Sequence, residues 1–144
     1  MRQVSRGAAA AFMLGAMGVQ VGTRFLIADE CLIHENYKEK LLKASDVSTM
    51  VTGKSMGDAV RCLKTPFSKK FFKMEYDPAV PKEEVLDFGK GAMRKAVFDG
   101  DNMGSYLAGE VAGMIHKKES AKDIVEDIMG GAEKLLKNAP SLVK

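Results

Sequence analysis

The chain has few of the residues that mark disulfide-rich or metal-binding proteins. Its 144 residues include only two cysteines, Cys31 and Cys62, which lie far apart and in no metal-ligand spacing. We therefore predict no metal site. We expect both cysteines to be reduced thiols of a cytoplasmic protein, because cytosolic proteins rarely keep disulfides. The alternative is a disulfide between the two.

A strong net charge and long apolar runs are also missing. There are 22 Lys and Arg against 19 Asp and Glu, a formal net charge of +3 that is spread along the chain. A dedicated nucleic-acid surface would normally show a clustered basic stripe, so we predict no nucleic-acid partner. No segment reaches the length of a membrane span, so we predict no membrane partner. The composition, 46% hydrophobic and 28% charged, is that of an ordinary soluble globular domain.

The amino terminus imitates a signal peptide, since Arg2 and Arg6 stand beside the apolar run 7–14. That run continues through a glycine turn into Val-Gln-Val, however, so we interpret it as a buried helix over 5–17, capped by Ser5. A short apolar strand follows at 19–22, of the kind found in parallel sheets that are covered on both faces.

Beyond this strand, hydrophobic periodicity and turn residues predict a mainly helical chain. His34 precedes the first of these helices and is expected to be a loop or cap residue. The predicted elements are helices at 35–44, 83–98, 104–116 and 120–138, a further helix from Pro66 onward, and a hairpin of strands 47–52 and 59–63.

The stretch 18–25, Gly-Val-Gln-Val-Gly-Thr-Arg-Phe, carries the clearest chemical signal. A strand that breaks at Gly22 frees backbone N–H groups and lets another group approach the main chain, which an anion such as phosphate can use. Thr23 adds a hydroxyl, and Arg24 can pair with a phosphate or with Asp29 or Glu30. The alternative is that Gly22 simply ends the strand.

This strand cannot satisfy its own backbone groups, because every buried N–H and C=O needs a partner. The hairpin is too polar and too far along the chain to be its obvious neighbour. The sequence therefore indicates the end of a larger α/β architecture.

Two segments carry a resemblance to a known superfamily. Residues 8–25 with Glu30-Cys31 resemble the last helix and strand of the nitronate monooxygenase and enoyl-acyl-carrier-protein reductase II superfamily. Residues 93–97, Gly100-Asp101 and 104–113 are similar to the carboxyl-terminal helical region of the reductase branch. The resemblance covers nearly the whole chain.

The superfamily consists of FMN-dependent (β/α)₈ TIM barrels, roughly twice this length because a barrel alone takes about 250 residues. The resemblance thus implies that 1–34 ends an FMN-binding barrel with its last helix, last strand and loop. It implies a mainly helical carboxyl-terminal region over 35–144, with the hairpin at about 47–63. FMN would be bound by Gln20, Val21, Gly22 and Thr23, at a phosphate site of the kind that barrels commonly build after strands seven and eight.

The implied activity is reduction of the double bond of an enoyl thioester on acyl carrier protein, in fatty acid biosynthesis, with NADH or NADPH as reductant. A second possibility is nitronate monooxygenase activity, in which alkyl nitronates are oxidised with oxygen. The histidine that the family places near the flavin is absent, so we predict no catalytic residue in this chain. If helix 104–116 lines the acyl pocket, Ser105 and Glu110 contact substrate; otherwise they are a cap and a surface residue.

A hypothesis of another class is that the chain alone has no catalysis. It would then be a truncated product or a helical interaction module. Its partner would be the missing amino-terminal barrel or, as a homo-oligomer, a second copy of the chain. An unpaired apolar strand would favour such an association.

Overall fold

The computed structural model describes residues 3–142, which form two compact units. The first joins the described parts of Met1–Cys31 and Lys118–Lys144, and the second is Leu32–Lys117. The predicted division at residue 34 had placed 118–144 with the second region, whereas in the structure that segment packs with the start of the chain. No helix among residues 3–142 is both long enough and apolar enough to cross a membrane.

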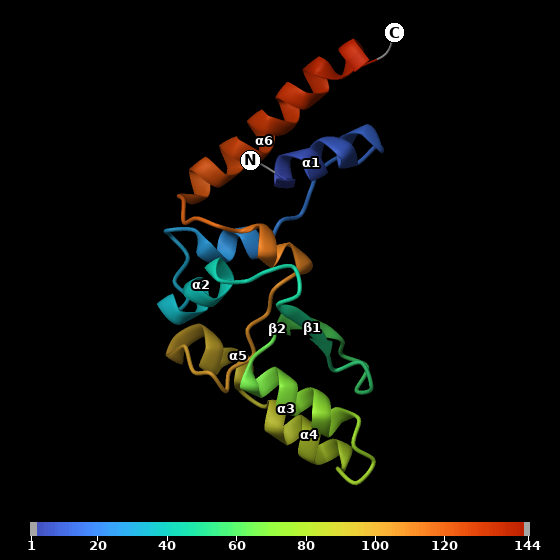
Figure 1. Cartoon of the computed structure of the whole chain (residues 1–144), viewed down its shortest axis with the longest axis vertical. Helices are drawn as coiled ribbons and strands as arrows, with labels where there is room; N and C mark the ends of the chain where they lie inside the picture. The colour runs from blue at the N-terminus through green and yellow to red at the C-terminus, as the bar shows by residue number, and fades with distance from the viewer. Residues whose placement is uncertain (1–2, 143–144) are drawn as a thin grey trace. The chain divides into compact units, whose positions relative to one another are not determined.

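The first unit is built on two helices that lie side by side, α1 (Gln3–Met13) and α6 (Ala121–Asn138), blue and orange-red in Figure 1. Helix α6 begins where the sequence predicted, and it continues into a short 3₁₀ turn, η4 (Ala139–Leu142). Small side chains of α1 meet apolar side chains of α6 to form the core of this unit. Its buried members are Ala8, Ala9, Ala28, Ile124, Ile128 and Ala132.

Two predictions about α1 were wrong in detail. Ser5 does not cap the helix but lies inside it, with 2% of its surface exposed. The helix ends at Met13 and not at residue 17, because Gly15 turns the chain with a φ of 94°. A Cβ on Gly131 of α6 would lie 2.6 Å from the Cβ of Ser5, so the two helices approach each other closely at this point.

The predicted strand at 19–22 is also wrong for the described chain, because these residues belong to no helix or strand. They are followed by the 3₁₀ helix η1 (Thr23–Ile27). The physical reason is that residues 3–142 offer this segment no neighbouring strand. Its apolar residues therefore remain partly exposed, Val19 to 37%.

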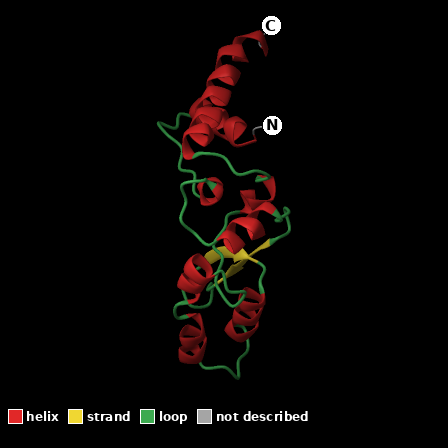
Figure 2. Ribbon diagram, turned by 90° about the vertical axis from the view of Figure 1, so that its left-hand side faces the viewer, coloured by secondary structure: helices red, strands yellow, loops and turns green. Residues whose placement is uncertain are grey.

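The second unit contains the predicted hairpin and several short helices (Figure 2). The two strands pair antiparallel, with Thr49 opposite Leu63 and Thr52 opposite Val60. Helix α3 starts at Pro66, where the Thr65 side chain accepts the N–H of Ser68, and it packs against α4. The elements are α2 (Glu35–Leu42), β1 (Thr49–Thr52), β2 (Val60–Leu63), α3 (Pro66–Glu75) and α4 (Lys82–Gly89).

The single helix predicted over 83–98 is in fact interrupted. Lys90 ends α4, and Gly91 has a φ of 71°, in the left-handed region that favours glycine. The chain then resumes as α5 (Ala92–Arg94), which runs into a π-helical turn, η2 (Lys95–Asp99).

The helix predicted over 104–116 was wrong as well. Only a 3₁₀ helix, η3 (Glu110–Met114), forms there. The preceding residues pair with β2 instead: the N–H of Leu63 donates to the carbonyl of Tyr106 at 2.8 Å, and the N–H of Ala108 donates to the carbonyl of Arg61 at 3.1 Å. Tyr106 and Ala108 therefore form hydrogen bonds with the open edge of β2, although hydrophobic periodicity alone had predicted that they lie in a helix.

Candidate functional site

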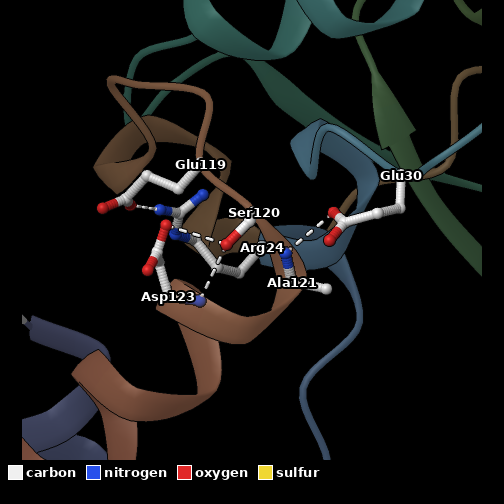
Figure 3. Close-up of polar contacts among 6 residues, drawn as sticks. All are labelled: Arg24, Glu30, Glu119, Ser120, Ala121 and Asp123. Atoms are coloured by element: carbon white, nitrogen blue, oxygen red, sulfur yellow. Dashed lines mark hydrogen bonds and ion pairs between the residues drawn. The ribbon is translucent and has the colours of Figure 1, made fainter.

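The loop that follows Gly22 is anchored to the start of α6, as Figure 3 shows. Arg24 forms an ion pair with Glu119, and the two side chains are only 13% and 16% exposed. The Glu30 carboxylate accepts the backbone N–H of Ala121 at 2.8 Å. Arg24 therefore braces this loop, as one of its two predicted roles required, but its partner is Glu119 and not Asp29 or Glu30.

The start of α6 is also capped from within. The Ser120 hydroxyl accepts the N–H of Asp123 at 3.0 Å and donates to the Asp123 carboxylate at 2.8 Å. Beside this cap, the N–H of Asp29 donates to the carbonyl of Glu119 at 3.1 Å. These contacts hold the residues that follow Gly22 against the start of α6.

The four residues predicted to bind FMN precede this anchored loop. Gln20 and Gly22 are exposed, Val21 and Thr23 are half-buried. Within residues 3–142, the backbone N–H groups of Gln20, Val21 and Gly22 donate to no other residue. A Cβ added to Gly22 would meet no atom within 4 Å. Successive free N–H groups beside an uncovered glycine are an arrangement that can bind an anion.

A second candidate site lies within the 32–117 unit, where a cavity of about 350 Å³ opens between the hairpin and α3, α4 and α5. Ser105, one of the two predicted substrate residues, lines it, and its N–H donates to the carbonyl of Ala92 at 2.9 Å. Glu110 does not line the cavity. Its carboxylate is 73% exposed and pairs with Arg61 at 2.8 Å.

Sequence reasoning missed most of this cavity. Phe67 and Phe71 lie in the helix predicted from Pro66 onward, and their aromatic character at helical spacing was a local signal for this wall. The other walls come from segments that are distant in the sequence. The lining residues are Thr52, Gly53, Met56, Asp58, Val60, Phe67, Phe71, Leu86, Gly89, Lys90, Ala92, Met93, Ser105 and Leu107.

The histidine and cysteine side chains have structural roles. His34 caps α2, since its Nδ1 accepts the N–H of Asn36 at 3.1 Å. Cys31 and Cys62 are both free thiols, as predicted. Cys62 is fully buried, and its burial raises the pKa of the thiol. Among residues 3–142, no three His, Cys, Asp or Glu side chains are placed to hold a metal ion.

Comparisons with known proteins show which family this chain resembles. The model of the nitronate monooxygenase family matches residues 3–131. FabK from Thermotoga maritima is 38% identical with a TM-score of 0.90, over 96% of this chain and 44% of its own. A Staphylococcus saprophyticus protein named "Probable nitronate monooxygenase" is 29% identical over 91% of this chain and 37% of its own length. The nitroalkane oxidase of Streptomyces ansochromogenes, 24% identical over 96% of this chain and 39% of its own, has a TM-score of 0.72, which shows the fold alone.

The chain thus spans between 37% and 44% of the length of these relatives. The match of the family model nevertheless extends over most of the chain, and it confirms the resemblance stated above. The chain belongs to the nitronate monooxygenase family, whose members are flavin-dependent oxidoreductases.

Proposed function

We propose that this chain supplies one edge of the FMN site in a flavin-dependent oxidoreductase of (β/α)₈ barrel architecture. One observation carries the proposal. The N–H groups of Gln20, Val21 and Gly22 have no acceptor among residues 3–142, and they stand directly before a loop that Arg24 and Glu119 hold in place. Neighbouring strands of a barrel would cover the apolar side chains of this segment, and the N–H groups at its carboxyl end would remain available to an anion.

The residues fit a phosphate group. No atom lies within 4 Å of a Cβ built on Gly22, so an anion can reach its main chain. The N–H groups of Gln20, Val21 and Gly22, with the hydroxyl of Thr23, would hold the phosphate of FMN. When bound, FMN would supply hydride transfer, while these residues only bind and orient it.

For the substrate we favour the double bond of an enoyl thioester on acyl carrier protein, with NADH or NADPH as reductant. The extensive likeness to FabK, a reductase of this type, supports this choice. Oxidation of an alkyl nitronate with oxygen is the second candidate, and the family model supports it. We propose that Ser105 contacts the substrate. We do not extend this role to Glu110, because its carboxylate pairs with Arg61.

The FMN proposal is tested by titrating the ¹⁵N-labelled chain with FMN and, as a phosphate-free control, riboflavin. We expect FMN to shift the amide resonances of 20–23, and riboflavin to leave them unchanged. Gly22→Val should abolish the shifts, because its side chain covers the main chain. Gly18→Val is the matched control, since Gly18 is also uncovered but lies outside the proposed site. Equal shifts with riboflavin, or full binding by Gly22→Val, would disprove the proposal.

The two reactions are separated in an enzyme that contains this sequence. Oxidation of NADH or NADPH that depends on crotonyl thioester indicates the reductase. Oxygen uptake that depends on an alkyl nitronate, without a nicotinamide cofactor, indicates the monooxygenase.

A further inference from the structure

Helix α3 presents an exposed face that combines aromatic and basic side chains. Lys69, Phe72, Lys73 and Tyr76 are spaced at i, i+3, i+4 and i+7, which places them on one face of the helix, with Tyr76 directly after its last residue. All four are exposed, Phe72 to 42% and Tyr76 to 52%. None of them lines the cavity of this unit. We call this face the α3 stripe.

The two aromatic rings of the stripe pack on each other at the surface. The ring centroids of Phe72 and Tyr76 are 4.8 Å apart, and the ring planes are tilted by 52°. The phenylalanines on the other side of α3, Phe67 and Phe71, contact Phe88 of α4 instead, and α3 and α4 lie side by side (Figure 1). Helix α4 therefore does not cover the stripe. Aromatic side chains are enriched in protein–protein interfaces and among the residues that dominate binding there.

The two lysines of the stripe differ from lysines in other helical segments. Among residues 3–142, neither Lys69 nor Lys73 forms an ion pair with a carboxylate. Lysines elsewhere pair with an acid four residues away: Lys43 with Glu39, Lys122 with Glu126 and Lys137 with Glu133. The α3 stripe therefore presents positive charge that the described chain does not neutralise by a direct contact.

The single acid of α3 is directed to the hairpin and not to solvent. The Glu75 side chain is buried, and its two oxygens accept the N–H groups of Gly53 and Ser55, each at 2.8 Å. The third lysine of the helix, Lys70, has a different environment, since its Nζ lies 4.8 Å from the centre of the Phe88 ring. The solvent-facing charge of the stripe thus comes from its two lysines alone.

We propose that the α3 stripe binds an acidic amphipathic helix of a partner protein. The two unpaired lysines would meet carboxylates, while the two exposed rings would be removed from water by apolar side chains of the partner. The inference goes beyond the proposed function, since the stripe requires neither flavin nor substrate. All its residues belong to the 32–117 unit, so it does not depend on how the two units are placed.

A protein helix fits this face better than a membrane does. Lys69 and Lys73 lie one helical turn apart, so carboxylates three or four residues apart on a partner helix can face both of them. Apolar side chains beside those carboxylates would pack against the rings of Phe72 and Tyr76. Anionic membranes usually attract clusters of about four to eight basic residues, whereas the stripe has two lysines.

The probe is a stapled helical peptide of about 14 residues, because unstapled helices of this length are marginal in water. Two glutamates four residues apart share one face with leucines, and a fluorescein label reports binding by its anisotropy. A control peptide of the same composition carries its glutamates on the face opposite the leucines. The first peptide should bind the chain saturably. The control should bind about two- to thirtyfold more weakly, as expected for the loss of two exposed ion pairs.

Paired lysine variants test the charge. Lys69→Ala combined with Lys73→Ala should weaken binding of the first peptide by about two- to thirtyfold. The matched control, Lys95→Ala combined with Lys134→Ala, removes two exposed lysines outside the stripe and should bind normally. Added salt should weaken binding to the native chain, because it screens charges at the surface.

Truncation of a ring tests the apolar part of the interface. Phe72→Ala should weaken binding at least about fivefold. The matched control is Phe98→Ala, which truncates a ring that is 66% exposed but lies outside the stripe, and it should have no effect. In the ¹⁵N-labelled chain, the peptide should shift the amide resonances of 69–76 and leave those of α6 unchanged. Circular dichroism at 222 nm verifies that each variant is folded.

The proposal is overturned if the first peptide does not bind, or if the two peptides bind equally well. Full binding by the double lysine variant or by Phe72→Ala also overturns it, as do shifts centred on another helix. Vesicles of phosphatidylcholine and phosphatidylglycerol test the lipid alternative. Binding to these vesicles without binding of the peptide overturns the proposal in favour of a membrane. Loss of FMN binding at 20–23 would leave all these results untouched, so the two proposals fail separately.

Discussion

Replacing Gly131 with alanine tests the packing that defines the first unit. Gly131 lies in α6, and a Cβ there would come within 2.6 Å of the Ser5 Cβ and 2.7 Å of its Oγ. Both distances are well under the 3.4–4 Å of ordinary van der Waals contact. Ser5 is buried inside α1, so its Cβ cannot move away without a shift of the helix.

Two effects of opposite sign determine how much Gly131→Ala changes the free energy of unfolding. Alanine in place of glycine inside a helix raises the free energy of unfolding by about 0.5–1 kcal/mol. Forcing an extra carbon into a packed interface lowers it by about 1–3 kcal/mol. The free energy of unfolding of Gly131→Ala should therefore lie between that of the native chain and a value about 2.5 kcal/mol lower.

The neighbouring glycine provides the matched control. Gly130 lies in the same helix, and a Cβ there would meet no atom within 4 Å. Gly130→Ala should therefore show only the gain of about 0.5–1 kcal/mol. The two variants should differ by about 1–3 kcal/mol. Urea unfolding, followed by the helical circular dichroism at 222 nm, measures both.

A double-mutant cycle identifies the clash as the cause. Ser5→Gly removes both atoms that a side chain at Gly131 would meet, so Gly131→Ala should cost less in the Ser5→Gly background than in the native chain. If Gly131→Ala proves as stable as Gly130→Ala, the close approach of α1 and α6 is refuted.

Further predictions concern single contacts. Ellman's reagent should titrate Cys31 in the native protein and Cys62 only after unfolding, because Cys62 is fully buried. The pKa of the Cys62 thiol is raised by burial, so the folded state keeps its proton while the unfolded state loses it. The free energy of unfolding should therefore fall as the pH rises above about 9, by up to about 1.4 kcal/mol per pH unit. Urea unfolding at a series of alkaline pH values measures this fall. Ser120→Ala should lower the free energy of unfolding by about 1 kcal/mol through loss of the α6 cap. Glu119→Gln should lower it by about 1–3 kcal/mol, because it removes the negative charge that faces the largely buried Arg24 guanidinium, whereas Glu126→Gln at the surface should change little.

Local signals predicted the elements that depend only on local interactions. Helix α6 starts directly after Ser120, within one residue of its predicted start at 120, and α3 begins at Pro66 as expected. The helix over 104–116 failed because the edge of β2 offered stronger partners for Tyr106 and Ala108 than a helix did. Hydrophobic periodicity along one segment carries no information about such a strand edge elsewhere in the chain.

The two candidate sites also differ in how far local sequence signals could predict them. The proposed phosphate edge lies within four consecutive residues, so a glycine after an apolar run was enough to indicate it. The cavity is assembled from the hairpin, from α3, α4 and α5, and from Ser105 and Leu107. Ser105 was identified from the family resemblance and not from its position, and no local pattern identifies Lys90 as a neighbour of Phe71.

The pairing of Ala28 with Glu119 has a consequence for synthesis of the protein. These two residues form an isolated parallel bridge, and between them the chain leaves the first unit at Cys31 and returns at Lys118. Helix α1 therefore emerges from the ribosome long before α6, the helix that covers its apolar face. The 32–117 unit is complete by then, and its folding brings the two ends of this long loop together at little extra entropic cost. We expect the 32–117 unit to fold during translation and the first unit to close only when α6 has been made.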